Sequence, residues 1–248
     1  MADGPAATRR APRPRATGST TLRLATYNIH GAIGGDGRFD PARIVAVLRE
    51  LDADVVALQE VESRRHGVHV LDRIARETGY DAIEGPTIVG EKRHFGNALL
   101  TRHRACTVRT LELNFGRREP RGAIDVELAC TRTPLRVLAT HLGLRPAERR
   151  AQVKQLLAAL QEKPDMPTAL MGDLNEWFLW GRPLRWLHAH FGDTHGPATF
   201  PALRPLLALD RIWVEGAEAV EVRAHRSALA RVASDHLPAV ADVRLRTR

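Results

Sequence analysis

The stretch LMGDLNEWF, residues 170–178, joins an apolar run of the β type to a polar exit. Gly172 interrupts the run, Asp173 and Asn175 follow it two residues apart, and large aromatic residues come next. Acidic residues are depleted in strands and avoid burial, so a core strand that ends in a carboxylate needs a reason. A turn uses the same residue types, and so does an active site. The rest of the chain decides between them.

Hydrophobic periodicity around this stretch predicts helices and strands in a mixed order. Asp40 is the expected N-cap of the first helix, with Pro41 at its first position. The predicted helices cover residues 40–51, 69–79, 145–163 and 183–191. The predicted strands cover residues 22–29, 54–61, 96–102, 105–113, 121–128, 135–142, 167–173, 208–214, 219–224 and 236–245. The four consecutive strands from 96 to 142 read as an antiparallel meander. This order predicts an α/β (α+β) protein with two mixed sheets packed face to face and helices outside.

Composition suits one large folded domain. The chain has 248 residues, 44% of them hydrophobic and 27% charged. Residues 1–20 are rich in Ala, Pro, Arg and Thr and lack the apolar stretch of a secretory signal, so we expect a disordered Arg/Pro-rich tail followed by one domain over 21–248. No apolar run reaches the length of about 18 residues that a membrane span needs, so no integral membrane segment is expected.

The net charge and the two cysteines restrict the function only loosely. A net charge of +8 favours an anionic partner such as a phosphate ester, nucleic acid or an acidic membrane surface, and equally fits the solubility of an Arg-rich protein. Cys106 and Cys130 have no metal-binding spacing and lie in β-like apolar runs. We expect core thiols in a reducing compartment, hence a cytoplasmic protein, although a disulfide between neighbouring strands is possible.

Five β-type segments share the feature of the opening stretch, because each is apolar and ends in polar residues of catalytic type. Those residues are Asn28, Glu60, His141, Asp173 with Asn175, and Asp235 with His236, while Asp210 begins a further strand. Singly, each has a simple structural explanation, such as a turn at Asn28, a solvated strand end at Glu60 or a surface ion pair at Asp210. Together they lie at the edges of one inferred sandwich, which favours an active site.

Their chemistry is that of a hard metal ion. Carboxylate and carboxamide oxygens without cysteine suit Mg²⁺ or Mn²⁺, with water and a substrate phosphate completing the shell. Two histidines and a spare aspartate can supply a base, an acid and charge stabilisation. The sequence has no zinc-type Cys/His cluster, P-loop or G-x-S-x-G motif.

With these residues in view, the chain resembles the endonuclease/exonuclease/phosphatase superfamily, and most closely its small bacterial members of unsettled substrate. The motifs that carry the resemblance are TYNIHG, LQEVE, FGNALLT, THLG, GDLNEW, LDRIWV and SDHLPAV, in the family's order over residues 22–245. The resemblance implies a four-layer α/β sandwich with the site at one end of the paired sheets. It also implies a divalent metal and phosphoester hydrolysis.

Motif matching then implies the roles of the metal-side residues. Glu60 would be the main metal ligand, with Asn28 beside it and Asp235 near the metal. His236 would orient or deprotonate the attacking water, with Asp210 as its carboxylate partner.

The remaining matched residues face the phosphate. Asp173 and Asn175 would position the nucleophile or phosphate, or hold a second metal. His141 would hydrogen-bond the phosphate and stabilise the transition state. Gly172 would keep a side chain away from the backbone near the phosphate.

Substrate contacts are expected from four further residues. Arg121 could contact phosphate or be a solvated arginine, and Asn97 lies in the FGNALLT motif. His30 stands where many repair-type members carry an acid, which argues against a repair nuclease. Trp177 either packs the following helix or lies at the rim of the site, where it could stack a base or meet an acyl chain.

We therefore predict a metal-dependent phosphodiesterase that acts on nucleic acid, a phospholipid or a small phosphoester. The alternative is a catalytically silent relative that binds nucleic acid or an anionic membrane. Such a relative would have lost one of Glu60, Asp173, Asp210 or His236, and all are present. The sequence gives no indication of oligomeric state.

Overall fold

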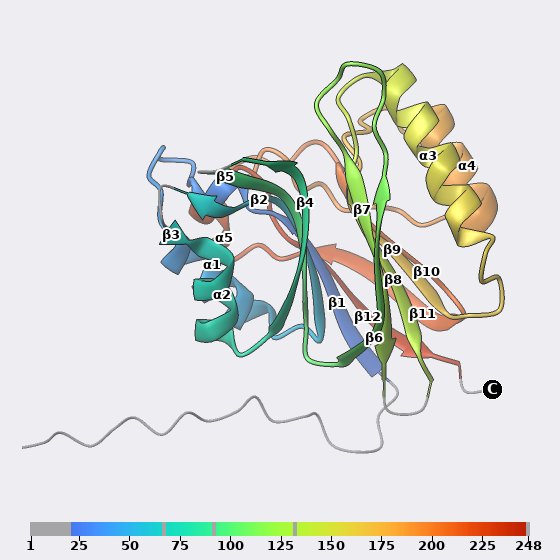
Figure 1. Ribbon diagram of the computed structural model, residues 1–248, viewed down its shortest axis with the longest axis horizontal. Coiled ribbons are helices and arrows are strands. Elements are labelled where there is room, and N and C mark those ends of the chain that lie inside the picture. The colour runs from blue at the N-terminus through green and yellow to red at the C-terminus, as the bar shows by residue number, and fades with distance from the viewer. Residues whose placement is uncertain (1–20, 66–67, 91–92, 131–132, 247–248) are drawn as a thin grey trace, which may run out of the picture.

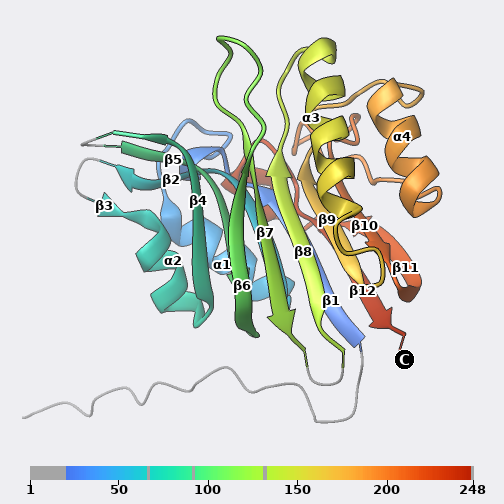
Figure 2. The same ribbon diagram turned by 45° about the vertical axis from the view of Figure 1, so that its right-hand side comes forward.

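The computed structural model describes residues 21–65, 68–90, 93–130 and 133–246, so the predicted tail at 1–20 lies outside the described residues. Its elements form four layers, with two β-sheets face to face and helices on both outer surfaces (Figures 1 and 2). The expected four-layer α/β sandwich is confirmed.

Both sheets are mixed. The first runs in the order β11 (Ala217–Ala224), β12 (Ala239–Leu245), β1 (Thr21–Asn28), β2 (Val55–Arg65), β5 (Arg93–Thr101) and β4 (Asp81–Val89), with the short β3 (Val68–His69) paired to β2. The second runs in the order β10 (Asp210–Glu215), β9 (Thr168–Asp173), β8 (Leu135–His141), β7 (Gly122–Ala129) and β6 (Arg104–Glu112). The helices are α1 (Pro41–Leu51), α2 (Val70–Thr78), α3 (Pro146–Leu160), α4 (Arg182–Phe191) and α5 (Ala230–Ala233), with a 3₁₀ turn at His30–Ala32.

Strand alternation builds the layers. Along β2, Val55 and Ala57 point into the core between the two sheets, whereas Val56 and Leu58 point toward α1 and α2. Successive side chains of a strand face opposite sides, so a strand covered on both faces reads as a continuous apolar run. The same rule places the second sheet against α3 and α4 on its other face.

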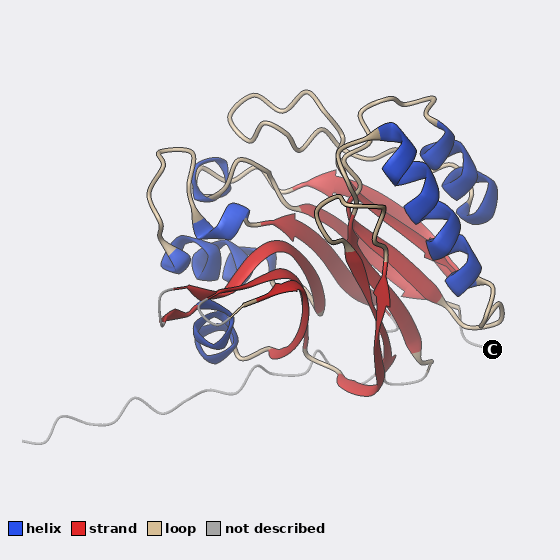
Figure 3. Cartoon of the chain, turned by 45° about the horizontal axis from the view of Figure 1, so that its top comes forward, coloured by secondary structure: helices blue, strands red, loops and turns tan. Residues whose placement is uncertain are grey.

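Two parallel strand pairs position the polar ends. β1 and β2 are parallel and joined through α1, and β8 and β9 are parallel and joined through α3. In the register, Asn28 lies opposite Gln59 in one pair and His141 opposite Asp173 in the other. The carboxyl ends of β1, β8 and β9 therefore meet at one end of the sandwich, where Figure 3 shows loops gathered. β2 continues to Arg65, so the prediction that this strand ends at residue 61 is wrong, and Glu60 lies inside the strand.

The first helix forms as its sequence predicts. Asp40 caps α1 by accepting a hydrogen bond from the Ala42 amide at 3.0 Å, and Pro41 occupies the first turn. Its apolar face is buried against the first sheet, including Ile44 and Leu48.

The predicted four-strand meander is wrong in part. β6, β7 and β8 form an antiparallel meander in the second sheet, but β5 pairs with β2 and β4 in the first. The chain crosses between the sheets in the two residues that separate Thr101 from Arg104. Apolar alternation marks a strand but carries no record of which sheet it joins. The sequence analysis also missed β4, an edge strand interrupted by Gly85 and Pro86.

Two smaller expectations change. Cys106 is exposed on the edge strand β6 and Cys130 is only half-buried, so the expected placement of both as core thiols is wrong, although both are free. No helix among the described residues is long and apolar enough to cross a membrane.

Gly172 is required by the neighbouring strand. A Cβ atom at this position would lie 1.9 Å from the carbonyl oxygen of Thr140, its partner on β8. The structural reason for glycine here is thus close strand approach, and not the proximity to phosphate inferred from sequence.

One buried ion pair ties the second sheet to α3. Asp125 and Arg136 lie side by side on β7 and β8, with two hydrogen bonds of 2.8 Å between them. Arg136 also donates to the carbonyl of Ala159 at 2.9 Å, and Arg109 approaches Asp125 from the strand on the other side. Removing one member of such a pair leaves a buried charge unpaired.

We predict that Asp125→Ala lowers the free energy of unfolding by about 3–5 kcal/mol, because Arg136 would be left buried without its partner. The double variant Asp125→Leu/Arg136→Met should recover most of that loss, because apolar residues of similar volume need no partner. Urea unfolding of the three proteins measures both effects. A single variant as stable as the wild type would show that the pair contributes nothing.

Candidate active site

The polar ends of six segments converge at the end of the sandwich where the parallel strands finish. β1, β8 and β9 deliver their last residues there, a bulge inside β2 brings Glu60 there, β10 begins there, and the turn before β12 crosses the same end. The residues brought together are Asn28, Glu60, His141, Asp173, Asn175, Asp210, Asp235 and His236. All but Glu60 and Asp235 are buried.

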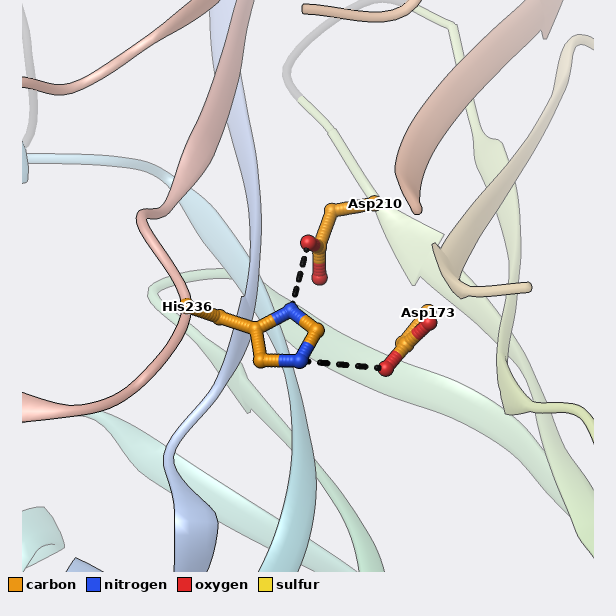
Figure 4. Close-up of side chains that lie close together, drawn as sticks. All are labelled: Asp173, Asp210 and His236. Atoms are coloured by element: carbon orange, nitrogen blue, oxygen red, sulfur yellow. Dashed lines mark hydrogen bonds and ion pairs between the residues drawn. The ribbon is translucent and has the colours of Figure 1, made fainter. Parts of the chain in front are cut away.

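His236 lies between two carboxylates, hydrogen-bonded to one and within ion-pair distance of the other. Its Nδ1 lies 2.8 Å from Oδ2 of Asp210, and its Nε2 lies 3.8 Å from Oδ2 of Asp173 (Figure 4). Thr199 donates to the same Asp210 oxygen at 2.6 Å, which fixes the carboxylate. One ligand atom each from Asp173, Asp210 and His236 lies within 4.8 Å of the others, a spacing that could hold a metal ion.

The electrostatics of this arrangement favour the imidazolium form. Burial by itself would lower the pKa of His236. The charge and hydrogen bond of Asp210 outweigh burial, and the nearby carboxylates of Asp173 and Asp235 add to them, so the pKa rises to about 10. The proton on His236 balances part of the carboxylate charge.

Asn28 connects carboxylates from the two sheets. Its Nδ2 donates to Oε1 of Glu60 at 2.9 Å and to Oδ2 of Asp173 at 3.0 Å, while its Oδ1 accepts from the His30 amide at 3.0 Å. Burial raises the pKa of Glu60, the hydrogen bond from Asn28 opposes this, and the charges of Asp235 and Asp173 raise it further. The carboxylates of Glu60, Asp173 and Asp235 therefore lie close enough to repel one another, and the nearby positive charge does not offset this repulsion.

The side chain of Glu60 is re-aimed by the backbone. Simple alternation along β2 would send it to the side of Val56 and Leu58, toward α1 and α2. A register shift between Leu58 and Val61 and a left-handed backbone at Glu60, with φ of 53°, turn it toward Asn28 instead.

Strained backbone collects at this end of the sandwich. Asn175 has φ of 50° and His30 has φ of 47°, so with Glu60 they make three of the five non-glycine residues with positive φ in the described ranges. Such conformations cost on the order of 1–3 kcal/mol each and are held only where the surroundings fix them. Their clustering supports a functional site.

His141 lies on the other side of Asp173. Its Nε2 is 2.9 Å from Nδ2 of Asn175 and 3.6 Å from Oδ2 of Asp173, and its Nδ1 is 3.4 Å from Nη1 of Arg121. Burial lowers the pKa of His141 to about 3, so the ring is neutral. Asn175 is itself fixed, because its side-chain Nδ2 donates to the Leu142 carbonyl at 3.0 Å and its backbone N–H donates to Oδ1 of Asp173 at 2.9 Å.

The remaining predicted residues lie further out. His30 and Asp235 face each other at 3.8 Å across a partly exposed edge. Asn97 donates to the Gly122 carbonyl at 3.0 Å and so joins the two sheets. Trp177 lies over the guanidinium of Arg149, 5.0 Å from it, and lines a separate pocket on the helix side of the second sheet.

Three supporting residues were missed by sequence reasoning. Thr199 orients Asp210, Phe200 packs its ring on His236 with centroids 4.8 Å apart, and Ser234 donates to the Asn28 carbonyl at 2.8 Å. Ser234 is the first residue of the SDHLPAV motif, which could have drawn attention to it. Thr199 and Phe200 lie in a long loop whose sequence has no periodicity, so nothing marked them.

The chain is similar to known proteins over almost its whole length. The sequence model of the Endonuclease/Exonuclease/phosphatase family matches residues 25–236. The uncharacterized protein YbhP of Escherichia coli K12 is 33% identical over 253 residues, which covers 94% of this chain and 100% of that protein.

Solved structures share the fold. An endonuclease/exonuclease/phosphatase from Bacteroides vulgatus superposes with a TM-score of 0.76 at 18% identity, covering 92% of this chain and 100% of its own. Truncated TDP2 of Caenorhabditis elegans superposes with a TM-score of 0.66 at 19% identity, covering 90% and 97%.

We predict that Asp210→Asn lowers the pKa of His236 by at least about 2 units, since burial would then act with much less opposition. NMR titration of the imidazole in EDTA measures this. In the wild type the raised pKa means that the charged pair stabilises the fold fully below about 6.5, the ordinary value, and loses that contribution as pH rises through about 10.

Asp242→Asn, which removes a carboxylate paired with Arg23 across β1 and β12 of the first sheet, is the control and should leave the His236 titration unchanged. An unchanged titration in Asp210→Asn as well would contradict the electrostatic account.

Proposed function

The chain belongs to the endonuclease/exonuclease/phosphatase family, and from this premise we propose that it hydrolyses phosphodiester bonds with the help of a divalent cation, Mg²⁺ or Mn²⁺. Membership supports activity on phosphoester bonds in general. The observation that supports the finer assignment is the His236–Asp210 pair at 2.8 Å, with Nε2 of His236 3.8 Å from Asp173. Asp173 in turn shares the side-chain nitrogen of Asn28 with Glu60.

The donor set fits a hard cation. Glu60 and Asp173 direct carboxylate oxygens at one amide nitrogen, and Oδ1 of Asp210 is buried without a hydrogen-bond partner among the described residues. We propose Glu60 as the main ligand, with Asn28 and Asp235 beside it. A bound cation would polarise the phosphoryl oxygens, and its charge would lower the pKa of His236 toward the range in which imidazole accepts a proton.

The protein groups on the other side would act on water. In its neutral form, His236 accepts a proton from the attacking water at Nε2, while Asp210 holds Nδ1 and so fixes the tautomer and the ring orientation. Thr199 holds Asp210 in place. Asp173, 3.8 Å from Nε2, is placed to orient the same water.

A second group of residues would hold the phosphate. Neutral His141 and the amide of Asn175 offer hydrogen bonds on the far side of Asp173, and Arg121 adds positive charge behind His141. In-line displacement needs such charge stabilisation on the phosphoryl oxygens. His30 and Asn97 lie farther from the His236–Asp210 pair and are proposed as outer substrate contacts.

We propose nucleic acid or a phospholipid-derived ester as the substrate class, and a cytoplasmic location in line with the two free thiols. A silent nucleic-acid- or membrane-binding relative is the outcome if no turnover is found.

We predict that the wild type hydrolyses bis-p-nitrophenyl phosphate with Mn²⁺ or Mg²⁺, and that His236→Ala lowers kcat about 10²- to 10⁴-fold, the usual contribution of a general acid–base group. His225→Ala is the matched control, since His225 pairs with Glu50 on the surface. Full activity in His236→Ala would overturn the mechanism, and inactivity of the wild type with every metal and phosphodiester offered would favour the silent relative.

We further predict that EDTA abolishes turnover and that Mn²⁺ raises the Tm of the wild type, because a ligand that binds only the folded state stabilises it. Glu60→Gln should lose this Tm shift, whereas Glu84→Gln, on an exposed position of β4, should keep it. A Tm shift of wild-type size in Glu60→Gln would remove Glu60 from the ligand set.

A further inference from the structure

A second pocket lies on the helix side of the five-stranded sheet, away from the candidate active site. Its volume is about 570 Å³, within the range of small-molecule sites. It is bounded by α4, the segment 194–198 and the segment 206–208. The lining side chains used below are Trp177, Trp180, Leu207, His188 and Arg211.

The pocket and the candidate active site lie on opposite faces of the same strand. Asp210 and Arg211 are neighbours on β10, so their side chains point to opposite sides of the sheet. Asp210 bonds His236 between the sheets, whereas Arg211 lies beside Trp213, whose ring belongs to the core under α3 and α4. A ligand in the pocket would therefore not contact the catalytic groups.

Arg211 is a buried cation, and two of its three guanidinium nitrogens have no hydrogen-bond partner among the described residues. Only 3% of its surface is exposed, and neither Nε nor Nη2 finds an acceptor in the part of the chain that the structure describes. Burial lowers its pKa, opposed by the charges of Glu176 and Asp210. Glu176 is already engaged, because it accepts two hydrogen bonds from Arg149 at 3.1 and 3.2 Å. Buried guanidinium groups without acceptors are costly and rare, so this one calls for a ligand.

Gly196 packs closely against the guanidinium of Arg211. A Cβ atom on Gly196 would lie 3.1 Å from Nη1 of Arg211, so a larger residue would crowd the guanidinium. Nε2 of His188, in the same pocket, is also buried and unpaired within the described ranges. Polar atoms without partners thus lie in a pocket whose lining is mostly apolar, with Thr194 and His195 as its other polar side chains.

Apolar side chains at the mouth remain in contact with water. Trp180 is 75% exposed and Trp177 is 40% exposed, and Leu207 adds further apolar surface. Exposed aromatic residues around a pocket provide flat faces for an apolar or aromatic body.

We propose that this pocket binds an amphiphilic anion, a small molecule with one carboxylate or phosphate group and an apolar body. The anionic group pairs with Arg211, whose planar guanidinium offers parallel N–H donors to such oxygens. The apolar body packs against Trp177, Trp180 and Leu207. The site is independent of the phosphodiesterase proposal, because none of the residues assigned to catalysis or metal binding lines this pocket.

The test uses octyl phosphate as the probe, with the full chain in EDTA, by isothermal titration calorimetry and tryptophan fluorescence. We expect saturable binding to the wild type, and binding about tenfold or more weaker in Arg211→Met, the effect of losing hydrogen bonds to a charged group. Arg185→Gln, an exposed arginine on α4, is the matched control and should bind like the wild type. Gly196→Ala, which keeps the arginine but crowds it, should also weaken binding.

Three further measurements separate this proposal from its competitors. Octanoate should bind, whereas inorganic phosphate and octanol should bind more weakly, because each lacks one half of the recognised chemistry. His236→Ala should bind octyl phosphate like the wild type, which separates the pocket from the candidate active site. Arg211→Met should have a Tm equal to or above that of the free wild type, because it removes an unpaired buried charge.

Binding of octyl phosphate unchanged in Arg211→Met, or no binding to the wild type, would overturn the proposal. So would a marked loss of Tm in Arg211→Met, which would make Arg211 a structural residue. Equal binding of octanol and octyl phosphate would exclude recognition of the anion.

Discussion

A single amide nitrogen links the carboxylates of the two sheets. Nδ2 of Asn28 donates to Glu60 on the first sheet and to Asp173 on the second, at 2.9 and 3.0 Å. These acids, with Asp210, lie where water is largely excluded, and like charges in such a place repel strongly. Hydrogen bonds from Asn28 offset part of this repulsion. Burial and the remaining repulsion raise the pKa of Glu60. At His236 burial opposes the charged form, and the charges of Asp210 and Asp173 outweigh it and raise the pKa. Most features of this end of the sandwich follow from the need to hold that negative charge.

The fold makes the crowding possible. β1, β8 and β9 end at the same place, and β2 carries Glu60 to it. Left-handed backbone conformations then orient side chains that strand alternation alone would point elsewhere. The left-handed residue and the register shift at Glu60 turn its carboxylate across the sheet, and Asn175 is held in a similar conformation by Asp173 and the Leu142 carbonyl. A rigid frame with strained residues at one edge is typical of a preorganised site.

β10 carries buried charges of opposite sign on its two faces. On one face Asp210 belongs to an acidic cluster that fits a cation, and on the other Arg211 is a buried cation that fits an anion. The first agrees with the family to which the chain belongs. The second has no counterpart in the motifs, since Arg211 reads as an ordinary residue in LDRIWV. It becomes visible only when its burial and its missing partners are known.

The sequence alone determined most of the elements, β4 excepted, and the motif residues. Continuous apolar runs and a capped amphipathic helix gave most strands and α1, and polar residues at strand exits indicated the residues that the structure brings together. These features are local, so a linear pattern records them. Only the tertiary structure decided that β5 joins the first sheet, that Gly172 is required by Thr140, that Glu60 turns against the alternation of its strand, and that Thr199 holds Asp210. Each of these depends on which residues from distant parts of the chain meet in space, and that information is not present in any short segment.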